Sequence, residues 1–257
     1  MNVGILGIGN LGSSIIGGLV QSKLEGMKLY AYDKNKTNLI KFKNNRVYIA
    51  ESEEELFNAS DVLILAVKPT QIKGVLNKLP VSFSGKTLIS AAAGISTDFI
   101  RENLHPINVK IFRIMTNLGC EFNVAPVLVA GDLPLDSGAE DALTALGKIY
   151  QVNEQLLDSI TTIVGSGPAL ISYFLDSLVQ YCKIVGLEGD SSREIVNMVA
   201  LSTSYYLKYK EVSYEELIEK VTTPGGITLK VIHNMDKMSV KGRIVDSLIR
   251  AGSLKSH

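Results

Sequence analysis

The first twelve residues constrain the fold of this chain more than any other stretch. An apolar run over residues 2–6 is followed by glycines at positions 7, 9 and 12. This pattern predicts a strand that turns directly into a helix: Gly7 permits the tight turn, Gly9 leaves room for a pyrophosphate, and Gly12 lets the helix pack on the strand. An ordinary glycine turn is the alternative interpretation. The amphipathic stretch after the turn, and a second strand that ends in an acidic residue, favour dinucleotide binding.

The second strand indicates which dinucleotide to expect. Residues 13–24 have the pattern of a helix, and Lys28 to Asp33 that of a strand. An acidic residue at the end of this strand accepts hydrogen bonds from the adenosine ribose hydroxyls, so Asp33 favours NADH. Lys34 and Lys36 could instead meet a 2′-phosphate, and Asp33 could simply form a turn that caps the next helix. The predicted cofactor is therefore NADH or NADPH, with a slight preference for NADH.

Further apolar runs complete an α/β domain. Residues 61–67 and 86–93 are continuous apolar runs, as expected of parallel strands that are buried on both faces. We also predict strands over residues 46–50, 109–114, 124–130 and 149–152, and helices over 52–58 and 137–148. A capping box of Ser52 and Glu55 opens the first of these helices. The predicted fold is an N-terminal Rossmann-type sheet over residues 1–153, doubly wound and mostly parallel.

The pattern changes after Asn153, where strand signals stop and helix signals follow one another. The helix predicted over residues 166–187 is apolar almost all round and confines its polar residues to one stripe: Ser172, Asp176, Gln180 and Lys183. Such a helix must be covered on several sides. We therefore predict an all-α dimerisation domain over residues 154–257, in a homodimer or a larger oligomer built on dimers. Capping boxes that begin at Ser191 and Ser213 predict two further helix starts.

A pair of adjacent glycines marks a second candidate site. Each glycine in the first turn of a helix costs on the order of 1 kcal/mol relative to alanine, so Gly225 and Gly226 must have a use. Thr223 is predicted as the N-cap and Pro224 as the first helical residue. Glycines at this point expose free backbone N–H groups, which bind carboxylates and phosphates. A loop that merely needs flexibility is the alternative interpretation.

Composition narrows the possible partners. Lysine and arginine together number 26, as do aspartate and glutamate, so no basic surface argues for nucleic acid. Cys120 and Cys182 fit neither a disulfide framework nor a zinc site. No apolar run approaches the length of a membrane span, and no leader segment precedes the first strand. We expect a cytoplasmic protein with a small-molecule substrate and without a metal, nucleic-acid or membrane partner.

Taken together, the motifs resemble those of pyrroline-5-carboxylate reductases along essentially the whole chain. The resemblance rests on the glycine turn and on Ala-Val-Lys-Pro at 66–69, Ser-Ala-Ala-Ala-Gly at 90–94, Arg-x-Met-x-Asn at 113–117, Gly-Ser-Gly-Pro-Ala at 165–169 and Pro-Gly-Gly-x-Thr at 224–228. It implies reduction of the cyclic imine 1-pyrroline-5-carboxylate to L-proline, the last step of proline biosynthesis, with NAD(P)H. It also implies a helical domain that interlocks with a partner subunit, so that the substrate lies between one chain's sheet and the other's helices.

The resemblance assigns the candidate site residues. It implies that backbone N–H groups of Gly225, Gly226, Ile227 and Thr228 hold the substrate carboxylate, and that the Thr228 hydroxyl, the candidate catalytic group, points at the imine nitrogen. The predicted cofactor-binding residues are Gly7, Ile8, Gly9, Asn10, Leu11, Gly12, Asp33, Lys34, Ala66, Val67, Lys68, Pro69, Ala92, Met115 and Asn117. A cyclic imine arrives protonated, so positioning supplies most of the catalysis. We therefore assign no catalytic role to His105, His233 or His257.

Departures from the family pattern leave two other functions open. The chain has Met-Thr-Asn-Leu-Gly at 115–119 where the family usually has Met-Pro-Asn-Thr-Pro, and two lost prolines leave a loop less stiff. Leu170 replaces a usual aromatic residue, and Gln180 a usual aspartate. A dinucleotide-binding regulatory paralogue is one alternative, although the anion site at 224–228 argues against it. A β-hydroxyacid dehydrogenase is less favoured, because residues 165–172 contain no lysine.

Overall fold

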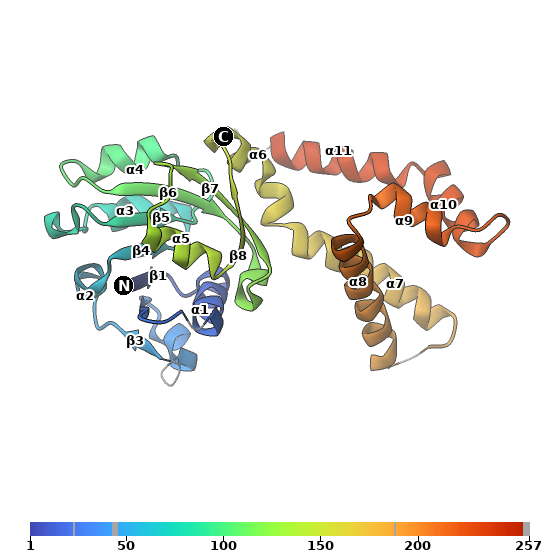
Figure 1. Ribbon diagram of the computed structural model, residues 1–257, viewed down its shortest axis with the longest axis horizontal. Helices are drawn as coiled ribbons and strands as arrows, with labels where there is room; N and C mark the ends of the chain where they lie inside the picture. The colour runs from blue at the N-terminus through green and yellow to red at the C-terminus, as the bar shows by residue number, and fades with distance from the viewer. Residues whose placement is uncertain (23, 43–45, 188, 254–257) are drawn as a thin grey trace. The chain divides into compact units, whose positions relative to one another are not determined.

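A computed structural model describes residues 1–22, 24–42, 46–187 and 189–253 (Figure 1). The chain divides into two compact units, Met1–Gly167 and Pro168–His257. The described strands all belong to the first unit: β1 (Asn2–Leu6), β2 (Lys28–Tyr32), β3 (Val47–Ile49), β4 (Val62–Leu65), β5 (Thr87–Ser90), β6 (Lys110–Met115), β7 (Ala125–Gly131) and β8 (Gly147–Gln151). Its helices are α1 (Asn10–Ser22), α2 (Glu53–Ala59), α3 (Ile72–Leu76), α4 (Thr97–Leu104), α5 (Ser137–Thr144) and α6 (Glu154–Val164), with 3₁₀-helices η1 (Lys36–Phe42), η2 (Pro69–Gln71), η3 (Val81–Phe83) and η4 (Leu118–Phe122).

The strands form one sheet that is doubly wound, as the sequence predicts. The described strands lie in the order β3-β2-β1-β4-β5-β6-β7-β8, and each neighbouring pair is parallel except β6 and β7. The strand order reverses between β1 and β4. In such sheets ligands bind outside the carboxyl ends of the strands at this reversal. The glycine turn follows β1 directly, so the fold places it at the expected binding edge.

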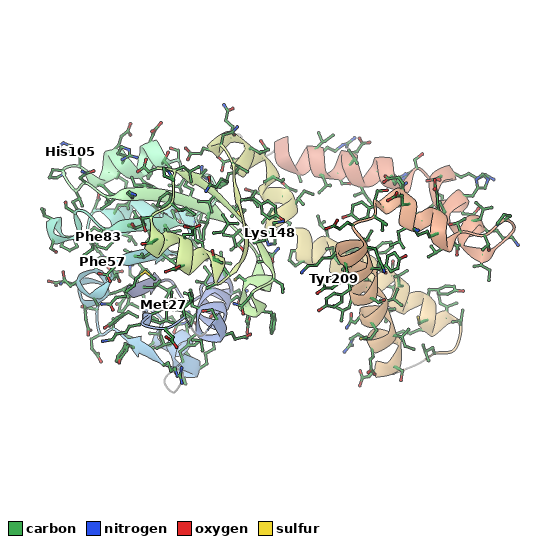
Figure 2. The ribbon with its side chains drawn as sticks, viewed as in Figure 1. Met27, Phe57, Phe83, His105, Lys148 and Tyr209 are labelled. Carbon is green, nitrogen blue, oxygen red and sulfur yellow. The ribbon has the colours of Figure 1, made fainter. Side chains whose placement is uncertain are left out.

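Helices cover both faces of the sheet, which explains why the central strands are apolar throughout. All four residues of β4 are buried. Ile64 packs in a cluster with α1 and α5 on one face, whereas Leu63 packs with α2, α3 and α4 on the other. Phe57 and Phe83 belong to this second cluster, and Figure 2 labels them on that side of the sheet. A buried parallel strand has no solvent face, so its sequence does not alternate.

Several predicted boundaries within the first unit are wrong. The helix predicted over 137–148 ends at Thr144, because residues from Gly147 pair with β7 as strand β8. The strand predicted over 86–93 ends at Ser90. Ser52 caps α2 by accepting the Glu55 N–H at 3.1 Å, but the Glu55 carboxylate accepts the N–H of Glu51 rather than that of Ser52. The last residues of the helix predicted over 13–24 include Lys23, which lies outside the described residues.

The second unit is helical, as predicted, but two of its helix starts differ from expectation. It contains most of α7 (Gly167–Ile184), and then α8 (Asp190–Lys210), α9 (Tyr214–Val221), α10 (Ile227–Lys237) and α11 (Val240–Ser253). The capping box at Ser213 is confirmed. The one at Ser191 is wrong, because α8 begins at Asp190 with Gly189 as its N-cap. Thr223 and Pro224 also lie outside α10, which begins at Ile227 after the N-cap Gly226.

The helices of the second unit expose apolar side chains. None of the residues of α7, all of which the structure describes, is buried within the chain. On α8, the rings of Tyr205 and Tyr209 stack with centroids 5.6 Å apart, and Figure 2 shows Tyr209 projecting from the helix. By length and composition alone, the described helical stretch Glu154–Ile184 could cross a membrane. The expectation that no stretch approaches that length is therefore wrong.

Helix α6 packs on the sheet. Leu157 and Val164 contact Met115, which ends β6, and Leu128 of β7. The compact first unit accordingly extends to Gly167 and includes α6, whereas the predicted domain boundary lies at residues 153–154. By its packing, α6 is therefore the last complete helix of the first unit. The sequence-based prediction instead makes the same residues the first helix of the helical domain.

Candidate functional site

The glycine turn has the geometry that a dinucleotide requires. Gly7 has φ +93°, which favours glycine, and its N–H donates to the carbonyl of Tyr32 at 3.0 Å. A Cβ atom on Gly12 would lie 2.0 Å from the carbonyl oxygen of Gly7, so only glycine allows the helix to start this close to the turn. A Cβ on Gly9 would meet no described atom within 4 Å. Gly9 therefore borders open space, as its predicted role demands.

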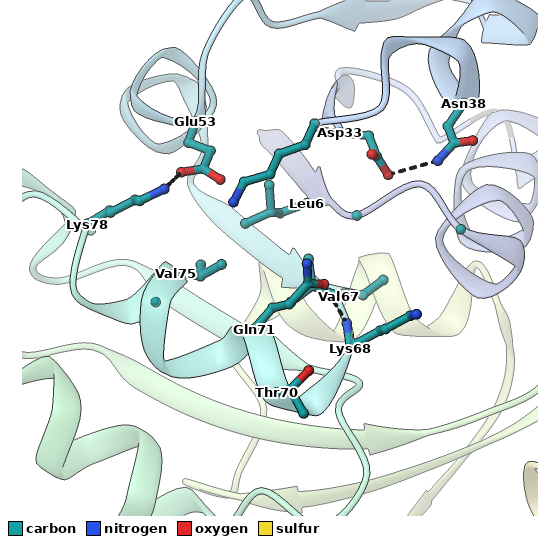
Figure 3. A pocket seen from close by; sticks show the side chains of 15 residues that line it. Leu6, Asp33, Asn38, Glu53, Val67, Lys68, Thr70, Gln71, Val75 and Lys78 are labelled. Atoms are coloured by element: carbon teal, nitrogen blue, oxygen red, sulfur yellow. Dashed lines mark hydrogen bonds and ion pairs between the residues drawn. The ribbon is translucent and has the colours of Figure 1, made fainter.

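A cavity of about 510 Å³ lies beside this turn (Figure 3). The predicted cofactor residues that line it are Gly7, Gly9, Asp33, Lys34, Ala66, Val67 and Lys68. The sequence analysis missed its other lining residues, which are Leu6, Asn38, Glu53, Thr70, Gln71, Gly74, Val75 and Lys78. Most of these residues follow β2 or β4. The sequence could have indicated them only through that position, because the carboxyl ends of parallel strands lie at one edge of the sheet. Figure 3 shows the ion pair of Glu53 and Lys78, whose charged atoms are 2.6 Å apart. The hydrogen bond to Glu53 raises the pKa of Lys78.

Asp33 is bound by the protein at both of its carboxylate oxygens. Oδ2 accepts the N–H of Ile8 at 2.6 Å and the side-chain amide of Asn38 at 3.2 Å, the second of which is drawn in Figure 3. Oδ1 accepts the N–H of Asn35 at 2.7 Å. Asp33 thus forms the turn that the alternative interpretation proposed. It also holds the glycine turn, which sequence reasoning missed because Ile8 lies 25 positions away.

The remaining predicted cofactor residues lie outside the lining of the cavity. Ile8 is buried in the turn, Asn10, Leu11 and Gly12 open α1, and Pro69 begins η2. Ala92 and Met115 are buried where β5 and β6 end. Asn117 uses its side chain within the protein: Oδ1 accepts the N–H of Gly119 at 2.9 Å and Nδ2 donates to the carbonyl of Val164 at 3.0 Å.

The loop that lacks the family prolines is held by other contacts. Its 3₁₀-helix η4 packs so closely on α1 that a Cβ on Gly18 would lie 2.1 Å from the carbonyl oxygen of Cys120. Asn123 has a left-handed backbone, and its side chain donates to the carbonyls of Gly18 and Ala145. Burial raises the pKa of the Cys120 thiol to about 12. The loop is therefore fixed by packing and hydrogen bonds in place of the two prolines.

The second candidate site is the start of α10. Gly225 has φ +74°, and Gly226 donates its N–H to the carbonyl of Thr223 at 2.9 Å. The N–H groups of Ile227 and Thr228 lie in the first helical turn, where no carbonyl within the helix reaches them. An anion would therefore be met by these two groups, and the N–H of Gly226, one of the four that were predicted, is already engaged. Thr228 is half-buried and Ile227 is exposed.

The histidines occupy positions without evident chemistry. His105 follows α4, and Figure 2 shows it at the periphery of the first unit. His233 lies within α10, more than one helical turn beyond Thr228. His257 lies outside the described residues.

Comparisons with known proteins identify the family to which this chain belongs. The family model "Pyrroline-5-carboxylate reductase dimerisation" matches residues 154–256, and "NADP oxidoreductase coenzyme F420-dependent" matches residues 2–94. A pyrroline-5-carboxylate reductase of Aquifex aeolicus is 31% identical over 97% of this chain and 94% of its own length. The chain belongs to the pyrroline-5-carboxylate reductase family. The Pisum sativum reductase is 26% identical over 97% of this chain and 93% of its own. A crystal structure of the Plasmodium falciparum pyrroline carboxylate reductase with NADP bound has a TM-score of 0.86 at 25% identity, covering 99% of this chain and 97% of that one.

Family membership confirms the resemblance and explains the apolar helices. The dimerisation model covers the second unit together with α6, which supports homo-oligomerisation through this region. Within one chain, no residue of α7 is buried, and a dimerisation region is expected to carry exposed apolar side chains of this kind.

Proposed function

We propose that this protein reduces 1-pyrroline-5-carboxylate to L-proline with a nicotinamide cofactor, as the last step of proline biosynthesis. The cofactor binds at the glycine turn after β1, and the substrate carboxylate binds the N–H groups at the start of α10. One pairing of features carries the proposal: an open glycine turn occurs together with a helix start whose Ile227 and Thr228 N–H groups lack helical partners. The chain that holds both is 31% identical to one of these reductases over 94% of that protein's length. The predicted meeting of one subunit's sheet with its partner's helices stays a prediction.

The chemistry asks little of ionisable side chains. The bound dihydronicotinamide supplies a hydride to the carbon of the C=N bond. The start of α10 binds and orients the substrate carboxylate, since first-turn N–H groups carry partial positive charge. The Thr228 hydroxyl belongs to the same helical turn. It hydrogen-bonds the ring nitrogen of the substrate and stabilises this atom as the iminium loses its positive charge. The Asp33 carboxylate keeps the glycine turn in place through Ile8.

We further propose that NADH is the preferred cofactor. A negative charge at Asp33, held by three donors beside the cavity, repels a 2′-phosphate and accepts hydrogen bonds from ribose hydroxyls. The Plasmodium falciparum protein holds NADP, so a relative of this chain binds the phosphorylated form of the cofactor. Lys34 also lines the cavity and is the group that would favour NADPH.

Replacing Asp33 by serine tests this preference. We expect the ratio of kcat/KM for NADH to that for NADPH to fall at least tenfold, which corresponds to about 1.4 kcal/mol, because the repelling charge is gone. Affinity for NADH should fall as well, since Ile8 loses its acceptor. Steady-state kinetics with both cofactors measure the ratio. A parent enzyme that prefers NADPH tenfold would contradict the assignment and point to Lys34 and Lys36.

Complementation tests the activity itself. The gene should restore growth of a proline auxotroph without added proline, and a Gly9→Ala variant should not. A chain that binds NADH but neither complements nor reduces the imine in vitro would instead support the regulatory alternative. The buried Cys120 does not favour a redox-responsive form of that alternative, because a thiol with a pKa of about 12 is not a thiolate at neutral pH.

The remaining predictions on organisation belong to this proposal. We assign the apolar surface of α7 to a partner subunit in a homodimer, or in a larger oligomer built on dimers, rather than to a lipid bilayer. We place the protein in the cytoplasm and expect neither metal nor nucleic acid among its partners. We propose that the functional boundary between the cofactor domain and the dimerisation domain lies at residues 153–154. Helix α6 then belongs to the dimerisation domain by function, although it packs on the cofactor domain.

A further inference from the structure

Among the residues that the structure describes, Arg113 is the largest fully buried side chain, and it is charged. It lies on β6 and is 1% exposed. Its guanidinium donates from Nη1 to Glu154 at 2.6 Å, and to Asp158 from Nη2 at 2.6 Å and Nη1 at 3.1 Å. Both acids belong to α6. A buried charge is tolerated only with well-placed partners, so this arrangement fixes α6 against the strand.

The same cluster reaches a third element. The Glu154 carboxylate also accepts the N–H and the hydroxyl of Thr97, which begins α4, both at 2.8 Å. Burial raises the pKa of Glu154, but the hydrogen bonds from Arg113 and Thr97 outweigh it and lower the pKa overall. Glu154 is therefore ionised at neutral pH, and the first turn of α6 is held from two sides.

The end of α6 is tied to the segment that follows β6. Met115, two residues after Arg113, packs against Leu157 and Val164. Asn117 donates its side-chain amide to the carbonyl of Val164. Helix α6 is thus attached at both of its ends to β6 and the residues that follow it: Arg113 holds its first turns, and Asn117 holds its last residue. Moving the start of the helix would move the segment 115–117 with it.

We propose that Arg113 is a positioning residue for the nicotinamide half of the cofactor site, acting through α6 on the segment Met115–Asn117. This inference rests on the proposed function and on the family resemblance, which assigns Met115 and Asn117 to cofactor binding. Neither residue lines the cavity beside the glycine turn, so we assign this segment to the nicotinamide half of the cofactor. Arg113 does not line the cavity beside the glycine turn, where the adenosine and diphosphate bind. Its effect is therefore confined to one half of the cofactor.

The experiment compares two ligands of the full-length protein. NADH carries the nicotinamide, whereas ADP-ribose ends at the second ribose. In Arg113→Gln we expect the affinity for ADP-ribose to stay within about twofold of the parent, and the kcat per bound active site to fall on the order of tenfold to a hundredfold, as for small misplacements of reacting groups. The ratio of NADH to ADP-ribose affinity and the fluorescence of bound NADH should both change. Arg113→Lys keeps the charge but not the forked geometry, so its effects should be intermediate.

The control is Arg101→Gln, because Arg101 forms an exposed ion pair with Asp132 in the same unit and is 50% exposed. It should behave as the parent. If Arg113→Gln does not fold, the same measurements of affinity ratio and kcat on Arg113→Lys test the proposal. A variant that melts at a lower temperature, yet keeps the parental affinity ratio and kcat per bound site, overturns the proposal and leaves Arg113 a structural residue. If the parent does not reduce the imine, the proposed function fails, and the two-ligand comparison still decides the role of Arg113 because it needs no substrate.

Discussion

A Gly9→Ala variant is expected to fold like the parent and to bind NADH at least a hundredfold more weakly. In the free protein the added methyl group enters open space, so the free energy of unfolding should change by no more than about 1 kcal/mol. With a diphosphate on the turn, the same methyl group separates the phosphate from the backbone N–H groups. Losing two hydrogen bonds to a charged group, each worth about 1.5–3 kcal/mol, costs about 3 kcal/mol or more and predicts a loss of at least a hundredfold.

Gly12→Ala provides the contrast that makes this result specific. Its methyl group would lie 2.0 Å from the Gly7 carbonyl oxygen, and both atoms are part of rigid backbone or are bonded to it. We expect about 3 kcal/mol of destabilisation or more, as for severe overpacking, and loss of binding as a consequence. Thermal unfolding and NADH fluorescence titration, run on both variants, separate the two effects. A Gly9→Ala protein with parental NADH affinity would show that the dinucleotide does not lie on this turn.

Thr228→Ala is expected to lower kcat for imine reduction tenfold to a hundredfold while NADH affinity stays unchanged. The hydroxyl would hydrogen-bond the ring nitrogen most strongly as the hydride arrives, and a bond of about 1–3 kcal/mol that is made mainly in the transition state acts on kcat. Thr228→Ser keeps the hydroxyl and should recover most of the rate. The proposed contact of Thr228 is with the substrate, whereas the proposed cofactor site is the glycine turn, so NADH affinity in the absence of substrate should stay at the parental value.

The carboxylate site needs its own variant. Gly226→Ala should raise KM more than it lowers kcat, because a methyl group there crowds the carboxylate and does not touch the nitrogen. The added Cβ would also clash within the protein, because it would lie 2.5 Å from the Thr223 hydroxyl oxygen and 3.0 Å from the Thr223 carbonyl oxygen. The double variant Thr223→Ala with Gly226→Ala relieves the first clash, and Thr223→Ala alone is its control. If Thr228→Ala and Gly226→Ala both turn over the imine with parental kcat and KM, the substrate does not bind here.

Three helix N-termini in the second unit show why local sequence signals do not always locate the start of a helix. At Ser213 the capping box formed as predicted, because its two hydrogen bonds are local and nothing competes with them. At Ser191 another contact competes with the capping box: the neighbouring Ser192 is buried and donates to the carbonyl of Gly189, and the N-cap is Gly189, two residues before the predicted one. Before α10, the Gly226 N–H closes a turn onto Thr223, so the helix begins three residues later than the threonine and proline signals indicate. Alternative caps differ by about 1 kcal/mol, and one additional contact reverses the choice.

By itself the sequence determined the order of the strands, the conformation of the glycine turn and the change to a helical second region, and it indicated the apolar helix and the glycine pair on which our proposals rest. It did not indicate helices α3 and α4. These features depend on periodicity and on backbone conformations that a few adjacent residues specify. Only the tertiary structure decided that Asp33 holds the turn through Ile8, that Glu53 and Lys78 pair beside the cavity, and that Arg113 joins β6 to α6. Each of these contacts joins residues at least 25 positions apart in the chain. Such pairs have no periodic signal, since they exist only once the packing of the sheet and its helices brings their elements together.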